Sequence, residues 1–316
     1  MANNKIRILV TPCKDPDLDG TACAYAYAEF LRKTSMDEVI GAISGSIHRE
    51  AQFVFKTFNI SPMDDAEKEI KNCNKIIIVD ASDLRSLSDK IDPKKVMRVI
   101  DHRIVNDSHL FPNAKLQIEP VGSAATLIAE KFFNAQIQIS RESAALLFSA
   151  IISNTIDFKA RVTVPRDRKM ASWLKAKLVL PSDYIHSMFE YKSKISGSLE
   201  EVFYSDFATF CFNKIKLGIV QLEIIRVDSF IDKNLEQINE TLEKIKKDKG
   251  LDHILLSAID LEKGFNKFVA IDKDTEKILL SSVHKTKFIR GIAKRDGIIM
   301  RKELAPLIKN VLESTK

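Results

Sequence analysis

The chain has 316 residues, which favours two domains over one and leaves little room for a third. Hydrophobic residues make up 45% and charged residues 29%, so we expect a folded core and not a disordered chain, and the net charge of +6 does not indicate long nucleic acid as a partner. The sequence has no apolar run near the roughly 18 residues of a membrane span, no signal-peptide pattern and no disulfide spacing. We therefore expect a cytoplasmic protein.

The first half of the chain predicts a parallel sheet. Short apolar runs at Ile6–Val10, Ile76–Val79 and Val96–Ile100 are typical of buried strands, and a helix is expected at Ala22–Arg32. Strands that are continuously apolar and alternate with helices indicate a parallel sheet with helices on both faces, so the fold class is α/β. Further helices are expected at Ala124–Phe133 with Ser123 as N-cap, at Glu142–Ile152 and at Arg166–Leu178, with a loop at Ser153–Phe158.

A second, smaller α/β or α+β domain is expected after a linker at Pro181–Ser198, with domains at 1–189 and 190–316. It opens with a strand at Ile219–Val227 and an amphipathic helix that ends at Gly250. The remaining expected elements are strands at His253–Ile259, Lys267–Ile271 and Lys277–Ser281 and a closing helix at Glu303–Leu312.

Acidic residues and one histidine follow the three expected strands of the first domain: Asp17 and Asp19, then Asp80, then Asp101 and His102. Ligands of open parallel sheets lie at the carboxyl ends of the strands. Any one of these carboxylates alone could be a helix cap or a turn residue, but together they indicate a site. Hard divalent cations prefer carboxylate oxygens, and an extended 17–19 segment would direct both of its carboxylates to one side.

Several segments resemble the successive motifs of the DHH phosphoesterases. The resemblance is to the branch of manganese-dependent (family II) inorganic pyrophosphatases, exopolyphosphatases and prune proteins. It rests on Asp-Pro-Asp-Leu-Asp-Gly at 15–20, Ile-Ile-Ile-Val-Asp at 76–80, Val-Ile-Asp-His-Arg at 99–103, Val-Gly-Ser at 121–123, Ser-Asn-Thr-Ile-Asp-Phe-Lys at 153–159 and the Gly297–Leu307 segment.

This resemblance implies a DHH domain followed by a DHHA2-like domain, with two or more Mn²⁺ ions, or Co²⁺ or Mg²⁺, in a cleft between them. It also implies a homodimer formed through the first domain. Carried over by position, Asp17 binds one ion, Asp19 and His102 bind another, Asp80 bridges them, and Asp101 orients the site. Metal ions lower the pKa of bound water and neutralise phosphate charge, so the chemistry is reasonable for phosphoryl transfer.

Cations are expected on the substrate side of this site. The resemblance gives Arg301 and Lys302 to the electronegative end of the substrate, although a solvated basic turn is the alternative. Arg103 stands where the second histidine of the name-giving motif is usual, and it places a permanent cation at the phosphate.

Three further positions depart from the pyrophosphatase pattern. Cys13 stands where the first motif usually begins with a metal-binding histidine, and it is either a softer ligand or an inert buried thiol. Asn154 stands where an aspartate is usual and could coordinate only through its carbonyl oxygen. Ala208 stands where a substrate-binding lysine is usual.

We therefore expect a divalent-metal-dependent hydrolase of phosphoanhydride bonds in short inorganic polyphosphate or pyrophosphate, with exopolyphosphatase-like activity somewhat favoured by these departures. One alternative is a phosphodiesterase for very short oligonucleotides or cyclic dinucleotides. Another is a degenerate, non-catalytic binder of a phosphate ligand or a protein.

Overall fold

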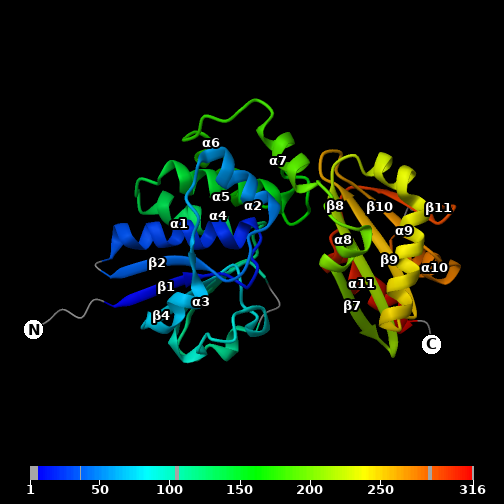
Figure 1. Cartoon of the computed structure of the whole chain (residues 1–316), viewed down its shortest axis with the longest axis horizontal. Coiled ribbons are helices and arrows are strands. Elements are labelled where there is room, and N and C mark those ends of the chain that lie inside the picture. Colours follow the sequence, from blue (N-terminus) through cyan, green and yellow to red (C-terminus); the bar gives the residue numbers. More distant parts are fainter. Residues whose placement is uncertain (1–5, 36, 104–106, 284–286, 315–316) are drawn as a thin grey trace, which may run out of the picture. The chain divides into compact units, whose positions relative to one another are not determined.

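The structure, a computed structural model, describes residues 6–35, 37–103, 107–283 and 287–314 (Figure 1). It forms two compact units, the first from residues 1–158 and 162–188, the second from 159–161 and 189–316. Each unit contains one six-stranded sheet, and the predicted α/β class is confirmed. No helix among the described residues is long and apolar enough to cross a membrane.

The sheet of the first unit is parallel throughout, in the order β3-β2-β1-β4-β5-β6. The inner strands are almost fully buried, which agrees with their continuous apolar runs. The three strands predicted from these runs are the neighbours β1, β4 and β5, so their carboxyl ends share one edge of the sheet. The strands are β1 (Arg7–Thr11), β2 (Glu38–Ile43), β3 (Asp64–Asp65), β4 (Lys75–Val79), β5 (Val96–Asp101) and β6 (Lys115–Ile118).

Helices cover both faces of this sheet, as expected (Figure 1). Helix α1 packs on β2 and against α4 and α5. Helix α3 lies on the opposite face, where it joins the apolar core formed there with side chains of the strands. Their bounds are α1 (Leu18–Thr34), α2 (Arg49–Phe58), α3 (Ala66–Glu69), α4 (Ala124–Asn134), α5 (Arg141–Thr155), α6 (Pro165–Lys175) and α7 (Tyr184–Lys192), with short 3₁₀ turns at Ile70–Asn72, Leu84–Ser86, Pro93–Lys95 and Ser108–Leu110.

Helix α1 begins four residues earlier than predicted. The carboxylate of Asp17 accepts the N–H of Gly20 at 3.0 Å and caps the helix, so Asp19 lies in its first turn. The prediction of an extended 17–19 segment is therefore wrong. The predicted N-cap of α4 is confirmed, because the side chain of Ser123 accepts the N–H of Ala125.

One other prediction about the first half is wrong. Helix α5 continues to Thr155, so Asn154 lies in its last turn instead of in a loop. The segment proposed as a linker contains helix α7, and residues 181–183 and 193–198 on either side of it are not helical; the boundary between the two compact units falls within this segment. Turn-forming residues at both ends of the segment concealed the helix between them.

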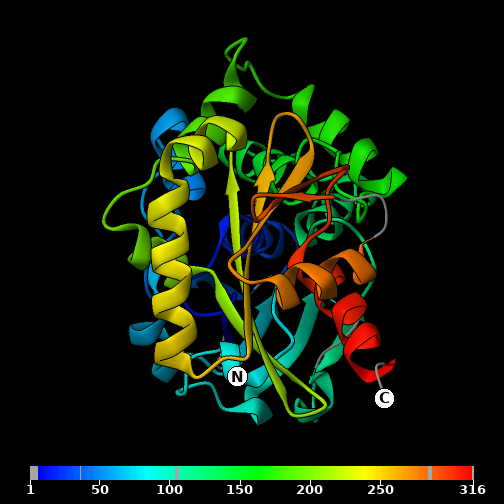
Figure 2. The same cartoon turned by 90° about the vertical axis from the view of Figure 1, so that its right-hand side faces the viewer.

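The sheet of the second unit has the order β11-β12-β10-β9-β8-β7, with only β8 and β9 parallel. Helices α8 and α9 pack on one face of this sheet, and α10 and α11 pack on the other (Figure 2). The elements are α8 (Leu199–Ser205), β7 (Phe207–Phe212), β8 (Ile215–Ile224), α9 (Val227–Lys249), β9 (His253–Asp260), β10 (Phe265–Ala270), α10 (Lys273–Ser282), β11 (Phe288–Ile289), β12 (Ile292–Asp296) and α11 (Arg301–Ser314).

The amphipathic helix is confirmed as α9, and Gly250 ends it in the left-handed conformation that glycine adopts without strain. The strand predicted at Lys277–Ser281 is wrong, because this segment lies in helix α10. The side chain of Asp272 caps α10 by accepting the N–H of Thr275 at 2.7 Å. A short apolar run does not distinguish a strand from a half-buried helix. In this segment the N-cap residue Asp272 favours the helix.

Candidate metal centre

Three polar side chains meet at the carboxyl edge of the first sheet. Asp80 follows β4 directly, His102 follows β5, and Asp19 reaches them from the first turn of α1. One ligand atom from each lies within 4.8 Å of the others. His102 Nε2 lies 3.5 Å from Asp80 Oδ1 and 4.0 Å from Asp19 Oδ2. The predicted convergence of these three residues is thus present in the structure.

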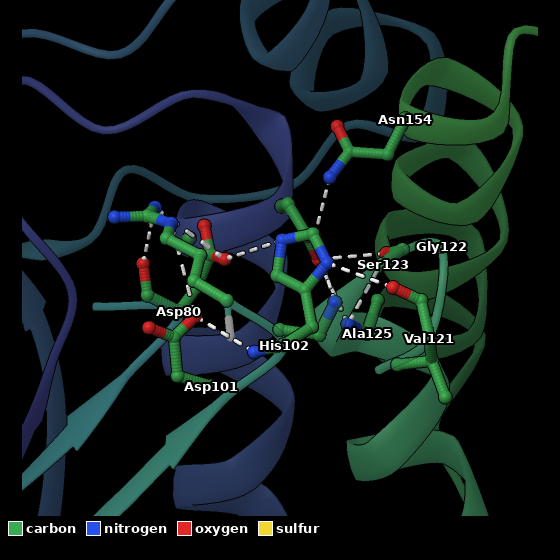
Figure 3. Close-up of polar contacts among 12 residues, drawn as sticks. Asp80, Asp101, His102, Val121, Gly122, Ser123, Ala125 and Asn154 are labelled. Atoms are coloured by element: carbon green, nitrogen blue, oxygen red, sulfur yellow. Dashed lines mark hydrogen bonds and ion pairs between the residues drawn. The ribbon is translucent and has the colours of Figure 1, made fainter. Parts of the chain in front are cut away.

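The tautomer of His102 follows from its other ring nitrogen. Nδ1 lies 3.0 Å from the carbonyl oxygen of Val121 (Figure 3), and a carbonyl only accepts, so Nδ1 carries the hydrogen. In the neutral ring, Nε2 then presents a lone pair to the two carboxylates. This is the form in which histidine binds a metal ion.

Asp80 supplies the observation that tests whether a cation fits. Its Oδ1 is buried, and no hydrogen-bond donor among the described residues reaches it. Burial, followed by the charges of Asp19 and Asp17, raises the pKa of the Asp80 carboxyl well above its usual range. The nearest positive group, Nη2 of Arg103, lies 3.8 Å from this oxygen and is too far to hydrogen-bond to it, so a buried carboxylate oxygen facing a histidine lone pair still has room for a closer positive partner. The donor set therefore fits a divalent cation.

Asp19 differs from Asp80 because hydrogen bonds surround it. Its carboxylate accepts from the hydroxyl of Ser123 and from the N–H groups of Ala124 and Ala125 at 2.8–2.9 Å. It therefore sits on the N-terminus of α4, where backbone donors and the helix dipole favour a negative charge. Burial raises its pKa, and these hydrogen bonds oppose that shift.

Asn154 completes the surroundings of Asp19. Its Nδ2 donates to Asp19 Oδ2 at 2.6 Å, so its amide nitrogen faces the cluster (Figure 3). The sequence predicts the carbonyl oxygen of this side chain as the ligand atom. Coordination by Asn154 stays a prediction, and it requires rotation of the amide and loss of this hydrogen bond.

Asp17 and Cys13 lie close enough to Asp80 to interact electrostatically with each other and with it. The Cys13 thiol has its pKa raised to about 12, first by burial and then by the negative charges of Asp80 and Asp17. At neutral pH the thiol is therefore protonated when no metal ion is bound beside it. Displacing that proton is one cost of using Cys13 as a ligand.

Arg103 and Asp101 flank the cluster. The Arg103 Nη2 donates to the carbonyl oxygen of Asp80 at 2.9 Å, while 39% of its side chain stays exposed. Burial acts to lower the pKa of Arg103, but the charges of Asp80 and Asp101 outweigh it and raise that pKa, so Arg103 remains a cation. Asp101 is buried and accepts the N–H of His102 at 2.7 Å and the hydroxyl of Ser82. It orders the chain at the strand end.

In the second unit, Arg301 and Lys302 lie in the first turn of α11. Arg301 forms an ion pair with Asp206 at 2.7 Å and also donates to the carbonyl oxygen of that residue at 2.6 Å. The backbone N–H of Arg301 donates to Gln221 at 2.6 Å. Lys302 is exposed. Sequence analysis does not identify Asp206, because its pairing with Arg301, 95 residues away, leaves no local signal in the sequence.

Comparison with known proteins settles the family. The profile of the DHH family, N-terminal domain, matches residues 7–151, and that of the DHHA2 domain matches residues 186–311. A manganese-dependent inorganic pyrophosphatase of Methanocaldococcus jannaschii is 32% identical over 296 residues, which are 89% of this chain and 93% of that protein. The chain belongs to the DHH family, in its pyrophosphatase branch.

Other DHH relatives agree over the full length. A manganese-dependent inorganic pyrophosphatase of Methanothrix thermoacetophila is 27% identical over 308 residues, 96% of each chain. The crystal structure of a family II inorganic pyrophosphatase candidate from Methanococcus jannaschii superposes with a TM-score of 0.74 at 28% identity, covering 97% of this chain and 100% of that one. The predicted family and fold class are confirmed.

Proposed function

We propose that this DHH protein is a divalent-metal-dependent hydrolase of phosphoanhydride bonds in inorganic pyrophosphate and short polyphosphates. One observation carries the proposal: Asp80 presents a buried oxygen without a donor among the described residues to the lone pair of His102, beside Asp19. The names of the relatives support manganese and pyrophosphate.

In this proposal Asp80, Asp19 and His102 would hold a first ion, and Asp17 and Cys13, which interact electrostatically with Asp80, would hold a second together with it. The bound ions supply a water of lowered pKa and neutralise phosphate charge. With both positions filled, the chain would hold two or more ions. Manganese is the proposed metal, with Co²⁺ next, because a thiol ligand disfavours Mg²⁺.

The chain's own cations then act on the phosphate groups. Arg103 is anchored on the Asp80 carbonyl and 39% of its side chain is exposed, so this guanidinium is the cation of the first unit proposed to bind phosphate oxygens. Asp101 holds the backbone that carries His102 and Arg103. Arg301 and Lys302 neutralise the departing phosphate, and Asp206 fixes the guanidinium of Arg301 in one orientation.

Phosphate release from pyrophosphate and tripolyphosphate, and mononucleotide release from a linear dinucleotide, measured with Mn²⁺, Co²⁺ and Mg²⁺ in turn, test the proposal. Release from the first two supports it. Cleavage of the dinucleotide alone would support the phosphodiesterase alternative. Metal binding without hydrolysis of any of the three would support a non-catalytic binder.

Substrate length is expected to depend on Ala208. We expect faster turnover of tripolyphosphate than of pyrophosphate, because a missing lysine leaves one cation fewer at the far phosphate and more room. Ala208→Lys should move the ratio of kcat/KM values toward pyrophosphate by about tenfold, the effect of one charged contact. Thr209→Lys adds the same charge at the next, exposed position of β7 and should leave the ratio unchanged. A strong preference of the unmodified protein for pyrophosphate would contradict the substrate half of this expectation.

Arg301→Gln should lower turnover of both substrates about 100-fold while leaving Mn²⁺ affinity unchanged, because one donor to developing charge is lost and no metal ligand is touched. Steady-state kinetics and calorimetric Mn²⁺ titration measure the two quantities. Lys309→Gln, a charge removed from the exposed side of the same helix, is the control. Weaker Mn²⁺ binding in Arg301→Gln would place Arg301 in a different role.

The assembly and location belong to the same proposal. We propose a cytoplasmic homodimer formed through the first domain, with inorganic phosphates as the small-molecule partners and neither a membrane nor long nucleic acid involved. Sedimentation of the purified chain at micromolar concentration tests the dimer; a monomer at all concentrations would exclude it.

A further inference from the structure

A buried carboxylate outside the cluster contacts the peptide group that holds His102. Asp167, the third residue of helix α6, is fully buried. Its oxygens accept the N–H of Gly122 at 3.0 and 3.2 Å, the hydroxyl of Thr126 at 2.6 Å and the N–H of Val164 at 2.8 Å. The bond from Val164 caps α6, but those from Gly122 and Thr126 come from a different part of the chain.

The N–H of Gly122 and the carbonyl of Val121 belong to one peptide group, which is planar. Asp167 binds its N–H side, and His102 Nδ1 donates to its oxygen at 3.0 Å. The Asp167 carboxylate, the 121–122 peptide group and the His102 imidazole are therefore linked in that order by hydrogen bonds. A charged acceptor on the N–H polarises the peptide and strengthens its carbonyl as an acceptor.

Gly122 permits this approach because it has no side chain. A Cβ atom at this position would lie 2.6 Å from the Thr155 methyl group and 2.7 Å from Asp167 Oδ2. Both distances are shorter than real contacts. The close contact between the Asp167 carboxylate and the peptide group thus depends on glycine at position 122. This contact keeps the peptide group in one orientation.

We propose that Asp167 is a positioning residue for the metal centre, acting through the 121–122 peptide to keep His102 in the Nδ1–H tautomer with Nε2 directed at Asp19 and Asp80. The expected effect on metal affinity rests on the proposed function. The expected tautomer of His102 does not. A carboxylate that hydrogen-bonds directly to a metal-binding histidine changes metal affinity by about 10–100-fold. For one acting through a peptide we expect the lower end.

Asp167→Asn keeps the shape of the side chain but removes its charge and turns one acceptor into a donor. Its matched control is Glu29→Gln, because Glu29 is also a buried carboxylate on a helix N-terminus, accepting from Ser140 and Ser143 at the start of α5. Both variants should lower the melting temperature of the metal-free protein, so stability alone does not distinguish them.

Nitrogen-15 NMR of the metal-free proteins, with the His102 signals assigned from a His102→Gln variant, decides the proposal. We expect a single Nδ1–H tautomer in the unmodified protein and in Glu29→Gln, and a mixture in Asp167→Asn. Mn²⁺ affinity should fall about tenfold in Asp167→Asn only. An unchanged His102 tautomer in Asp167→Asn would overturn the proposal, whatever the affinity.

If Asp167→Asn does not fold, Thr126→Val, which removes one donor to Asp167, serves in its place. We expect a smaller population of the second His102 tautomer in Thr126→Val than in Asp167→Asn. Absence of the second tautomer in Thr126→Val would refute the proposal. If the unmodified protein binds no Mn²⁺, the proposed metal function fails, while the tautomer result still decides the role of Asp167.

Discussion

Replacing Asp80 by asparagine is expected to remove the metal ions and with them nearly all activity. Asp80 is the proposed ligand of both positions, and an amide supplies neither charge nor a second oxygen. We expect Mn²⁺ affinity to fall more than about 100-fold and kcat/KM more than about 1000-fold. Asparagine tolerates the left-handed backbone of this position, where φ is 51°, so the fold should be retained. Elemental analysis and phosphate release measure the two losses.

The same variant should be more stable than the unmodified protein when no metal is present. The pKa of Asp80 is raised in the folded state, so the ionised carboxylate destabilises the fold above the pKa of the unfolded chain, and that cost grows as pH rises. Thermal melts without metal should therefore favour Asp80→Asn at pH 8 and show little difference at about pH 4. Asp83→Asn, a half-exposed aspartate just beyond the site, is the control. Normal metal content in Asp80→Asn would refute the shared-ligand assignment.

Restoring the usual family residues at two positions together, Cys13→His and Asn154→Asp, is the second large effect expected. An imidazole replaces a thiol that is protonated at neutral pH, and a carboxylate replaces an amide that donates to Asp19. Mn²⁺ affinity should rise by more than about tenfold, and by more than the two single changes predict, because both positions share Asp80. Calorimetric titration of the double and single variants measures this.

Without metal, the double variant should be less stable. A carboxylate introduced at position 154 cannot make the 2.6 Å hydrogen bond that Asn154 donates to Asp19, and it places a half-buried carboxylate against the buried one of Asp19. Melting temperatures should thus fall in chelator and rise in Mn²⁺, relative to the unmodified protein. Cys211→His with Asn113→Asp introduces the same groups at exposed positions and should change neither. An unchanged Mn²⁺ affinity in the double variant would remove both positions from the metal site.

The parallel sheet and its acidic edge were predictable because both depend on local patterns. Short apolar strands give the sheet, and parallel strands share an edge, so Asp80 and His102 had to lie near Asp19 once β1, β4 and β5 were neighbours. The family motifs added the order of these residues.

The hydrogen bonds that distinguish the carboxylates were not predictable. Asp19 receives donors from residues more than 100 positions away, and Asn154 reaches it because α5 continues beyond its expected end. Asp167 carries one local signal, since an acidic residue at the third helical position after Val164 is typical of a helix start. Nothing in the sequence connects it with Gly122.

The hydrogen bonds between Asp19 and the N-terminus of helix α4 have a consequence for which site residues this lineage can lose in evolution. Asp19 joins the start of α1 to the start of α4 through three donors, so its loss disturbs folding whether or not a reaction is catalysed. The side chain of Asp80 caps no helix: Arg103 forms an ion pair with it at 3.8 Å, but no donor among the described residues hydrogen-bonds its Oδ1, and its buried charge costs stability when no metal ion is present. Descendants released from selection for catalysis should therefore mutate Asp80 early and keep Asp19. An aspartate at position 19 is then a poor marker of an active enzyme, and one at position 80 is a good one.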